Sequence, residues 1–113
     1  MKVLLDECVP ERFRRHIPGH DVHSARYAGF SGKRNGELLQ LTEAAGYDVL
    51  LTVDQGIPFQ QKIYGRRIAL IVLRVPGNDI GTLARLANAV LQVLKEIAPG
   101  QVVELEFPAG PEA

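Results

Sequence analysis

Short apolar runs that end in polar residues divide the chain into alternating strands and helices. Residues 3–5 are apolar and stop at Asp6, and residues 49–53, apolar apart from one threonine, stop at Asp54. Both runs are too short for a helix and are typical of strands buried on both faces. Residues 68–73 read IALIVL and are apolar throughout, so we expect them to form the central strand of a sheet.

Three stretches have apolar residues at helical spacing. The first, residues 11–17, has only a narrow apolar stripe. In the second, we expect Asn35 to cap a helix that Gly46 ends in a left-handed conformation. In the third, Asp79 is expected to cap one long helix that continues without a break to Ile97.

Two weaker strands and one short helix complete the pattern. Residues 20–25 alternate modestly, and residues 103–107 alternate between apolar and acidic, which is typical of a strand at a sheet edge. A short helix is expected around residues 59–64 and a disordered tail at residues 108–113. Strands alternating with helices predict a three-layer α/β/α domain over residues 1–107, with a mostly parallel central sheet.

Composition narrows the classes of protein. The 113 residues are 46% hydrophobic, which suits one globular domain, and their formal net charge of zero excludes a global basic field. The single cysteine, Cys8, has no partner for an intrachain disulfide. We find no secretory leader and no apolar run of membrane-spanning length, so we expect a soluble, cytoplasmic protein that does not enter a membrane.

Acidic residues follow two of the predicted buried strands. Asp6 and Glu7 come after the first strand, and Asp54 comes after residues 49–53. In parallel sheets, ligands bind outside the carboxyl ends of the strands, so these acids are expected to converge there. Crowded carboxylates repel each other unless a cation compensates, and Mg²⁺ prefers oxygen ligands that it shares with phosphate and water. The sequence therefore predicts metal-dependent phosphate chemistry.

The same residues carry a resemblance to a known family. The chain contains LLDECVPERFRRHIPGHDV, then a glycine-rich loop, NGELLQLTEAAGYDVLLTVD and IALIVL. Over about residues 1–75 this resembles the PIN-like superfamily, in its small bacterial branch related to toxin ribonucleases. The resemblance implies that Asp6 and Asp54 bind Mg²⁺ or Mn²⁺ and hydrolyse single-stranded RNA, with Glu7 at a position that is often acidic. It also implies a toxin of a toxin–antitoxin pair and a small antitoxin-like partner.

Two positions depart from the pattern of that branch. Its central helix typically begins with an aspartate, whereas this chain has Asn35, which leaves Glu37 as the nearest acid and a candidate third ligand. Many relatives also have an aspartate two residues beyond the second strand-end acid, where this chain has Gly56. A catalytically weakened PIN-like module that acts by interaction or regulation is therefore an alternative.

A second resemblance competes for the same acids. An acidic pair after the first strand, Asp54 after a later strand, and Ile57 with Pro58 in the next loop resemble a response-regulator receiver, whose aspartate accepts a phosphoryl group. A receiver also needs Ser or Thr after its fourth strand and Lys after its fifth, where this chain has Arg74 and Pro108. The receiver therefore ranks second.

Basic side chains lie near the predicted site. Lys33 and Arg34 precede the possible helix ligand, and Arg12 follows the first acids, so these three are candidates for RNA phosphate contacts. The aromatic residues Tyr27, Phe30, Phe59 and Tyr64 are candidates for stacking on bases or for core packing. The apolar helix face from Leu86 to Ile97 could support a homodimer, although packing on its own sheet is the default.

Other nucleophiles and metal ligands have weaker patterns. His16, His20 and His23 suggest zinc, but residues three apart on a strand point to opposite faces, and Cys8 adds a single thiol. Ser24 and Thr52 have no evident base partner. Neither zinc binding nor a serine-type nucleophile is therefore expected.

Overall fold

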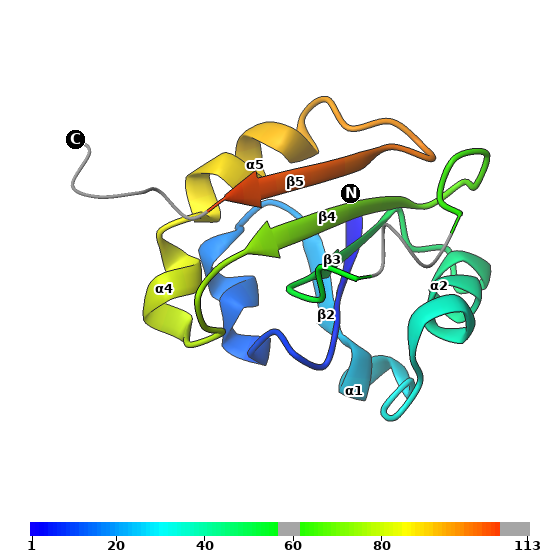
Figure 1. Cartoon of the computed structure of the whole chain (residues 1–113), viewed down its shortest axis with the longest axis horizontal. Coiled ribbons are helices and arrows are strands. Elements are labelled where there is room, and N and C mark those ends of the chain that lie inside the picture. Colours follow the sequence, from blue (N-terminus) through cyan, green and yellow to red (C-terminus); the bar gives the residue numbers. More distant parts are fainter. Residues whose placement is uncertain (57–61, 107–113) are drawn as a thin grey trace.

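The computed structural model describes residues 1–56 and 62–106. They form an α/β protein with strands and helices in alternation (Figure 1). In chain order the elements are β1 (Lys2–Leu5), the 3₁₀ helix η1 (Glu11–His16), β2 (Asp21–Ser24), α1 (Ala25–Ala28), α2 (Asn35–Ala44), β3 (Val49–Thr52), β4 (Ala69–Arg74), α4 (Ile80–Ala84), α5 (Ala87–Leu94) and β5 (Val102–Glu106).

The five described strands form one sheet in the order β2-β1-β3-β4-β5, and every neighbouring pair is parallel. The expectation of a mostly parallel sheet is confirmed. This order is doubly wound: the chain moves to one side of β1 to form β2 and then to the other side to form β3. The strand order thus reverses between β1 and β3, where ligands of open α/β sheets bind at the carboxyl ends of the strands.

Both faces of the sheet are covered by helices. On one face Leu4, Leu50 and Leu70 pair across three strands and pack with apolar residues of α2. On the other face the row Leu5, Leu51 and Ile71 packs with η1, α4 and α5 (Figure 1). The α5 face proposed for a homodimer is buried in this second cluster, so the default expectation of packing on its own sheet holds.

Two sequence-based expectations about the core require correction. Residues 69–73 are buried as predicted, but β4 is not the central strand, because β3 occupies the middle of the sheet. Burial on both faces requires a packed layer above and below the strand, which β4 has because its residues alternate between the two core clusters. The predicted long helix after Asp79 is two helices, α4 and α5, and main-chain bonds of 3₁₀ spacing separate them. That tighter turn brings Leu83 and Leu86, three residues apart, to the same buried side.

Helix ends differ in detail from the prediction. Asp79 caps α4 as expected, with its Oδ2 accepting a hydrogen bond from the Thr82 main chain at 2.9 Å. Gly46 adopts the expected left-handed conformation, with φ of 87°. Arg34, and not Asn35, is the residue before the first turn of α2. The turn α1 was not predicted, because four residues are too few to show a helical period.

Several expectations lie outside the described residues. They are the first half of the short helix predicted around residues 59–64, the last residue of the predicted edge strand, and the tail at residues 108–113. The described half of that predicted helix, residues 62–64, is not helical but leads into a turn, in which the Arg66 N–H donates to the Ile63 carbonyl at 3.0 Å. The described part of that edge strand, β5, is the outermost strand on its side, as expected. None of the described helices is both long and apolar enough to cross a membrane.

The Glu43 side chain connects α2 to the segment before β4 through a hydrogen bond and an ion pair. Its Oε2 accepts a hydrogen bond from the Arg67 main chain at 2.6 Å, and its Oε1 lies 3.1 Å from Nη1 of Arg66. The main-chain hydrogen bond, and secondarily the charge of Arg66, lower the pKa of Glu43 below its usual value. Because the folded state holds the ionised carboxylate, this stabilisation is present above the unfolded-state pKa and is lost as the pH falls through the lower folded-state pKa.

We expect Glu43→Gln to lower the free energy of unfolding by about 1 kcal/mol near neutral pH. The difference from the wild type should shrink as the pH falls below the unfolded-state pKa and through the lower folded-state pKa, where both states protonate the carboxylate. Urea unfolding at several pH values measures it, with the exposed Glu96→Gln as the control. A deficit in Glu43→Gln that is equally large in acid would contradict the role of the charge.

Candidate metal centre at the carboxyl edge of the sheet

Two aspartates flank the point where the strand order reverses. Asp6 directly follows β1, and its main-chain N–H donates to the Leu51 carbonyl of β3 at 2.9 Å. Asp54 lies two residues beyond the end of β3. The Asp6 side chain is half-buried and that of Asp54 is exposed, so both border the solvent at the carboxyl edge.

A buried threonine links the two aspartates. The Thr52 hydroxyl donates to Oδ2 of Asp6 at 2.7 Å and accepts from the Asp54 main-chain N–H at 3.0 Å. Thr52 is fully buried, so these bonds are shielded from water. The hydroxyl therefore fixes the Asp6 carboxylate relative to the start of the loop that carries Asp54.

Cys8 completes this buried group. Its Sγ lies 3.5 Å from the Thr52 hydroxyl oxygen, and because the hydroxyl proton points at Asp6, the thiol is the donor of this contact. Burial raises the pKa of the Cys8 thiol, and the nearby Asp6 charge adds to that effect. Cys8 is thus held as a protonated thiol, which supports the position of Thr52 and is a poor nucleophile or metal ligand.

Glu7 connects the edge to the glycine-rich loop before α2. Its main-chain N–H donates to Oδ1 of Asp6 at 2.7 Å, and its Oε1 accepts from the Gly32 main chain at 2.9 Å. Gly32 has φ of 81°, a conformation that side chains other than glycine rarely adopt. Asp54 also bonds locally, with Oδ1 accepting from the Gly56 main chain at 2.9 Å. Glu7 and Asp54 therefore each use one carboxylate oxygen to shape a loop.

The other predicted site residues are spread more widely. Glu37 lies in the first turn of α2 and forms an ion pair with Lys33 at 3.4 Å, so a candidate ligand and a candidate RNA contact engage each other. Arg34 is exposed just before α2. Arg12 is exposed on η1 and lines a hollow formed by that helix, apart from the one that contains Asp6.

The hollow beside Asp6 contains residues that the sequence did not single out as site residues. We call it the acidic hollow; its volume is about 300 Å³, and it is lined by Asp6, Glu7, Val9, Pro10, Glu11, Ser24 and Arg26. Arg26 reaches it because β2 pairs with β1 in a register that sets Ser24 beside Leu5. A prediction that β1 and β2 pair in parallel would have placed the residues after Ser24, including Arg26, beside Asp6 at the same edge of the sheet.

A divalent cation at this edge would need oxygen ligands from the acidic side chains. In residues 1–56 and 62–106, no group of three or more His, Cys, Asp or Glu side chains is placed to hold a metal ion. Mg²⁺, however, is commonly bound through one or two carboxylates, with waters and substrate phosphate completing its shell. The carboxylate of Asp6 borders the acidic hollow and suits that mode, whereas Asp54 is not among the residues that line this hollow.

His23, a residue of the zinc hypothesis, has other partners. Its Nε2 lies 2.8 Å from Oδ1 of Asp21, and its Nδ1 lies 2.8 Å from the Tyr47 hydroxyl. Burial raises the pKa of Tyr47, with the Asp21 charge adding to the effect, so the phenol keeps its proton. Both ring nitrogens of His23 are thus engaged within the protein.

Comparison of the chain with protein-family models, with curated proteins and with solved structures gives no match. The fold and the site define the class of protein: an α/β protein with a parallel sheet, in which a buried threonine hydroxyl at the strand-order reversal bonds the side chain of Asp6 and the main chain of Asp54.

Proposed function

We propose that this protein is a PIN-like ribonuclease that hydrolyses phosphodiester bonds of single-stranded RNA with the help of Mg²⁺ or Mn²⁺. The observation that carries the proposal is the Asp6 carboxylate, which the buried Thr52 hydroxyl holds at the reversal of strand order while also accepting from the main-chain N–H of Asp54. A buried donor that holds a carboxylate in place pre-organises it for a hard cation. Hydrogen bonds to the ligands have this role in known metal sites. The resemblance in sequence supports the choice of RNA.

In this proposal, Asp6 and Asp54 hold the metal, and Glu7 or Glu37 assists. The bound ion supplies Lewis acidity toward a phosphoryl oxygen and lowers the pKa of a coordinated water. Arg26 lies in the same acidic hollow and is suited to offset the negative charge of a phosphate beside the carboxylates. Lys33, Arg34 and Arg12 are proposed to contact the RNA backbone farther from the reacting phosphate.

We also propose a small partner protein for this chain. The resemblance implies a small antitoxin-like protein, with the enzyme as the toxin of the pair, acting in the cytoplasm. A homodimer would have to use a surface other than the α5 face, because that face packs on the sheet.

Incubation of the purified protein with single-stranded RNA tests the activity. We expect cleavage products with Mg²⁺ or Mn²⁺ and none with excess EDTA. Cleavage that persists in EDTA would contradict a metal-dependent mechanism. No cleavage at any metal concentration would favour the catalytically weakened module, an alternative that Asn35 and Gly56 support because the resemblance implies acids at both positions.

A second candidate is a receiver-like phosphoacceptor domain that uses Asp54. The strand order favours it, because receivers have the same order, and Asp6 with Glu7 follows β1 as their acidic pair does. Against it, β4 ends at Arg74, which pairs with Glu104 at 2.9 Å, in the place of the required Ser or Thr. Incubation with a small phosphodonor decides: phosphorylation that is lost in Asp54→Asn would favour the receiver.

A further inference from the structure

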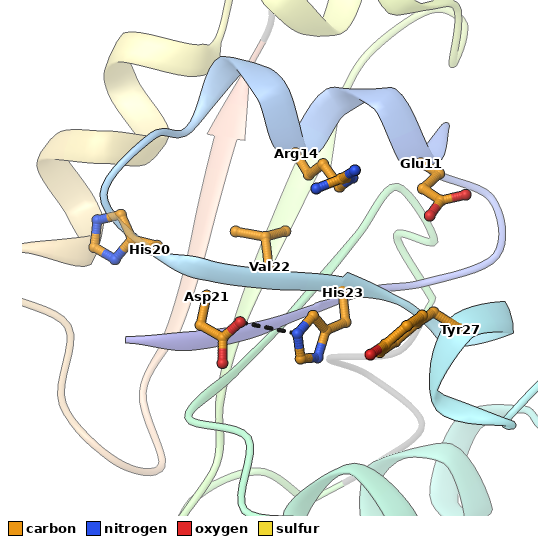
Figure 2. A pocket seen from close by; sticks show the side chains of 7 residues that line it. All are labelled: Glu11, Arg14, His20, Asp21, Val22, His23 and Tyr27. Atoms are coloured by element: carbon orange, nitrogen blue, oxygen red, sulfur yellow. Dashed lines mark ion pairs between the residues drawn. The ribbon is translucent and has the colours of Figure 1, made fainter.

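A second hollow lies along the open edge of β2. This edge hollow has a volume of about 340 Å³ and is lined by Glu11 and Arg14 of η1, by His20, Asp21, Val22 and His23 at β2, and by Tyr27 of α1 (Figure 2). β2 is the outermost strand on its side of the sheet. The volume is near the lower end of the range of about 300–1,000 Å³ for small-ligand sites, which suits a single nucleotide.

The main chain of β2 offers hydrogen-bonding groups to this hollow. The Asp21 N–H donates to the Met1 carbonyl, so Asp21 faces the neighbouring strand β1. Because successive residues of a strand direct their main-chain groups to opposite sides, Val22 turns its N–H and C=O toward the open edge. With only four residues, β2 gives few such groups, too few for a long peptide strand but enough for the edge of a base.

Tyr27 presents an aromatic ring at the edge hollow. It is 71% exposed, an unusual state for a large aromatic side chain, so the structure does not support the core-packing alternative for it. Its ring lies against the His23 ring, with 4.8 Å between centroids, and its main-chain N–H donates to the Ser24 hydroxyl at 3.0 Å (Figure 2). His23 is in turn held by Asp21 and Tyr47. The Tyr27 ring is therefore an ordered platform with a face available for stacking.

Positive charge lies on the opposite wall of the edge hollow. Arg14 lines it, and Arg12 and Arg15 are exposed beside Arg14 on η1. Within the described part of the chain, no hydrogen bond or ion pair holds the guanidinium groups of these three arginines. Unpaired guanidinium groups next to an aromatic platform suit a strand whose phosphates follow η1 and whose bases face β2.

The edge hollow adjoins the proposed catalytic edge. Glu11 lines both the edge hollow and the acidic hollow. Arg26 and Tyr27 are consecutive on α1, yet Arg26 lines the acidic hollow and Tyr27 lines the edge hollow. A chain with a phosphate at Arg26 can therefore place a neighbouring base at Tyr27.

We propose that the edge hollow is a nucleotide subsite, in which Tyr27 stacks on a base of single-stranded RNA and Arg14 contacts an adjoining phosphate. This inference rests on the proposed function for the identity of the ligand. It adds a base-binding position next to the reacting phosphate.

Binding of a short labelled single-stranded RNA, followed by fluorescence anisotropy in EDTA, tests the subsite apart from catalysis. Tyr27→Ala should weaken binding about 5- to 100-fold, since stacking is worth that much for one base. Tyr27→Leu, which keeps apolar bulk without a π face, should also weaken it, and Tyr27→Phe should retain it. Val102→Ala is the control, because Val102 is an exposed apolar side chain on β5, at the opposite edge of the sheet from β2.

The outcomes separate this inference from the ribonuclease proposal. Equal affinities for the wild type and Tyr27→Ala, or no RNA binding by the wild type, would overturn the subsite. If the wild type cleaves RNA in a metal-dependent way and Tyr27→Ala binds RNA as tightly as the wild type, the ribonuclease proposal stands and the subsite is contradicted. Binding that depends on Tyr27 without any cleavage would retain the subsite and remove the nuclease.

Discussion

Asp6→Asn should reduce metal-dependent RNA cleavage roughly a thousandfold, because the loss of one charged ligand removes several kcal/mol of transition-state stabilisation. Asparagine has nearly the same shape and still offers an oxygen to the Thr52 hydroxyl, which donates to Asp6 at 2.7 Å. Its amide group then replaces only the oxygen that accepts from the Glu7 main chain, a bond at the exposed surface. The fold should therefore survive. The measurement is the initial rate of cleavage of a labelled single-stranded RNA in Mn²⁺, with circular dichroism to confirm folding.

The matched control for this experiment is Asp48→Asn. Asp48 is exposed and lies just before β3, at the opposite end of the sheet, where its Oδ2 accepts from the Lys2 main chain at 2.8 Å. The Asp48→Asn variant should cleave RNA at the wild-type rate. If Asp6→Asn also retained that rate, the activity would belong to a contaminant or to another site. Asp54→Asn should behave as Asp6→Asn does.

Thr52→Val should weaken activity roughly 10- to 100-fold, as the loss of supporting hydrogen bonds does at other metal sites. Valine preserves the volume but leaves the Asp54 N–H without its acceptor and Asp6 without its buried donor. An unsatisfied buried group costs about 1–3 kcal/mol, so the free energy of unfolding should also fall by that amount. Denaturant unfolding and the metal concentration for half-maximal cleavage measure the two effects.

Thr42→Val separates the site-specific effect from the general cost of removing a buried hydroxyl. Thr42 is also fully buried, but its hydroxyl donates to the Leu38 carbonyl within α2, which still accepts the helical N–H in the variant. We expect normal activity and a stability change below about 1 kcal/mol. If the two valine variants lost activity equally, Thr52 would have no special role in positioning Asp6.

The strands were predictable because burial on both faces permits little but apolar residues. Residues 3–5 and 69–73 are buried throughout, and their ends in the sequence are close to their ends in the structure. The alternation in β5 likewise matched an edge strand. An apolar run indicates that helices cover both faces of a strand, but it does not give the strand's place in the sheet order, so β4 was mistaken for the central strand.

Helix breaks and side-chain links were less accessible from sequence. The break before α5 preserves the apolar face of the predicted long helix, so the periodicity continues across it. Thr52 was noted only as a residue without a base partner, because its roles toward Asp6 and Asp54 depend on the pairing of β1 with β3. The strand-end position of the two aspartates was evident, whereas the hydroxyl that joins them required the structure.

The parallel sheet also determines how this protein should fold. None of its described strand pairs is closed by a short hairpin, and Val3 of β1 pairs with Val49 of β3 only after three helices (η1, α1 and α2) and another strand have intervened. The chain loses the entropy of closing such long loops before the contacts between the strands stabilise it. We therefore expect the chain to fold in milliseconds or more slowly, with the hydrogen bond of Asp6 to β3 among the contacts that form late.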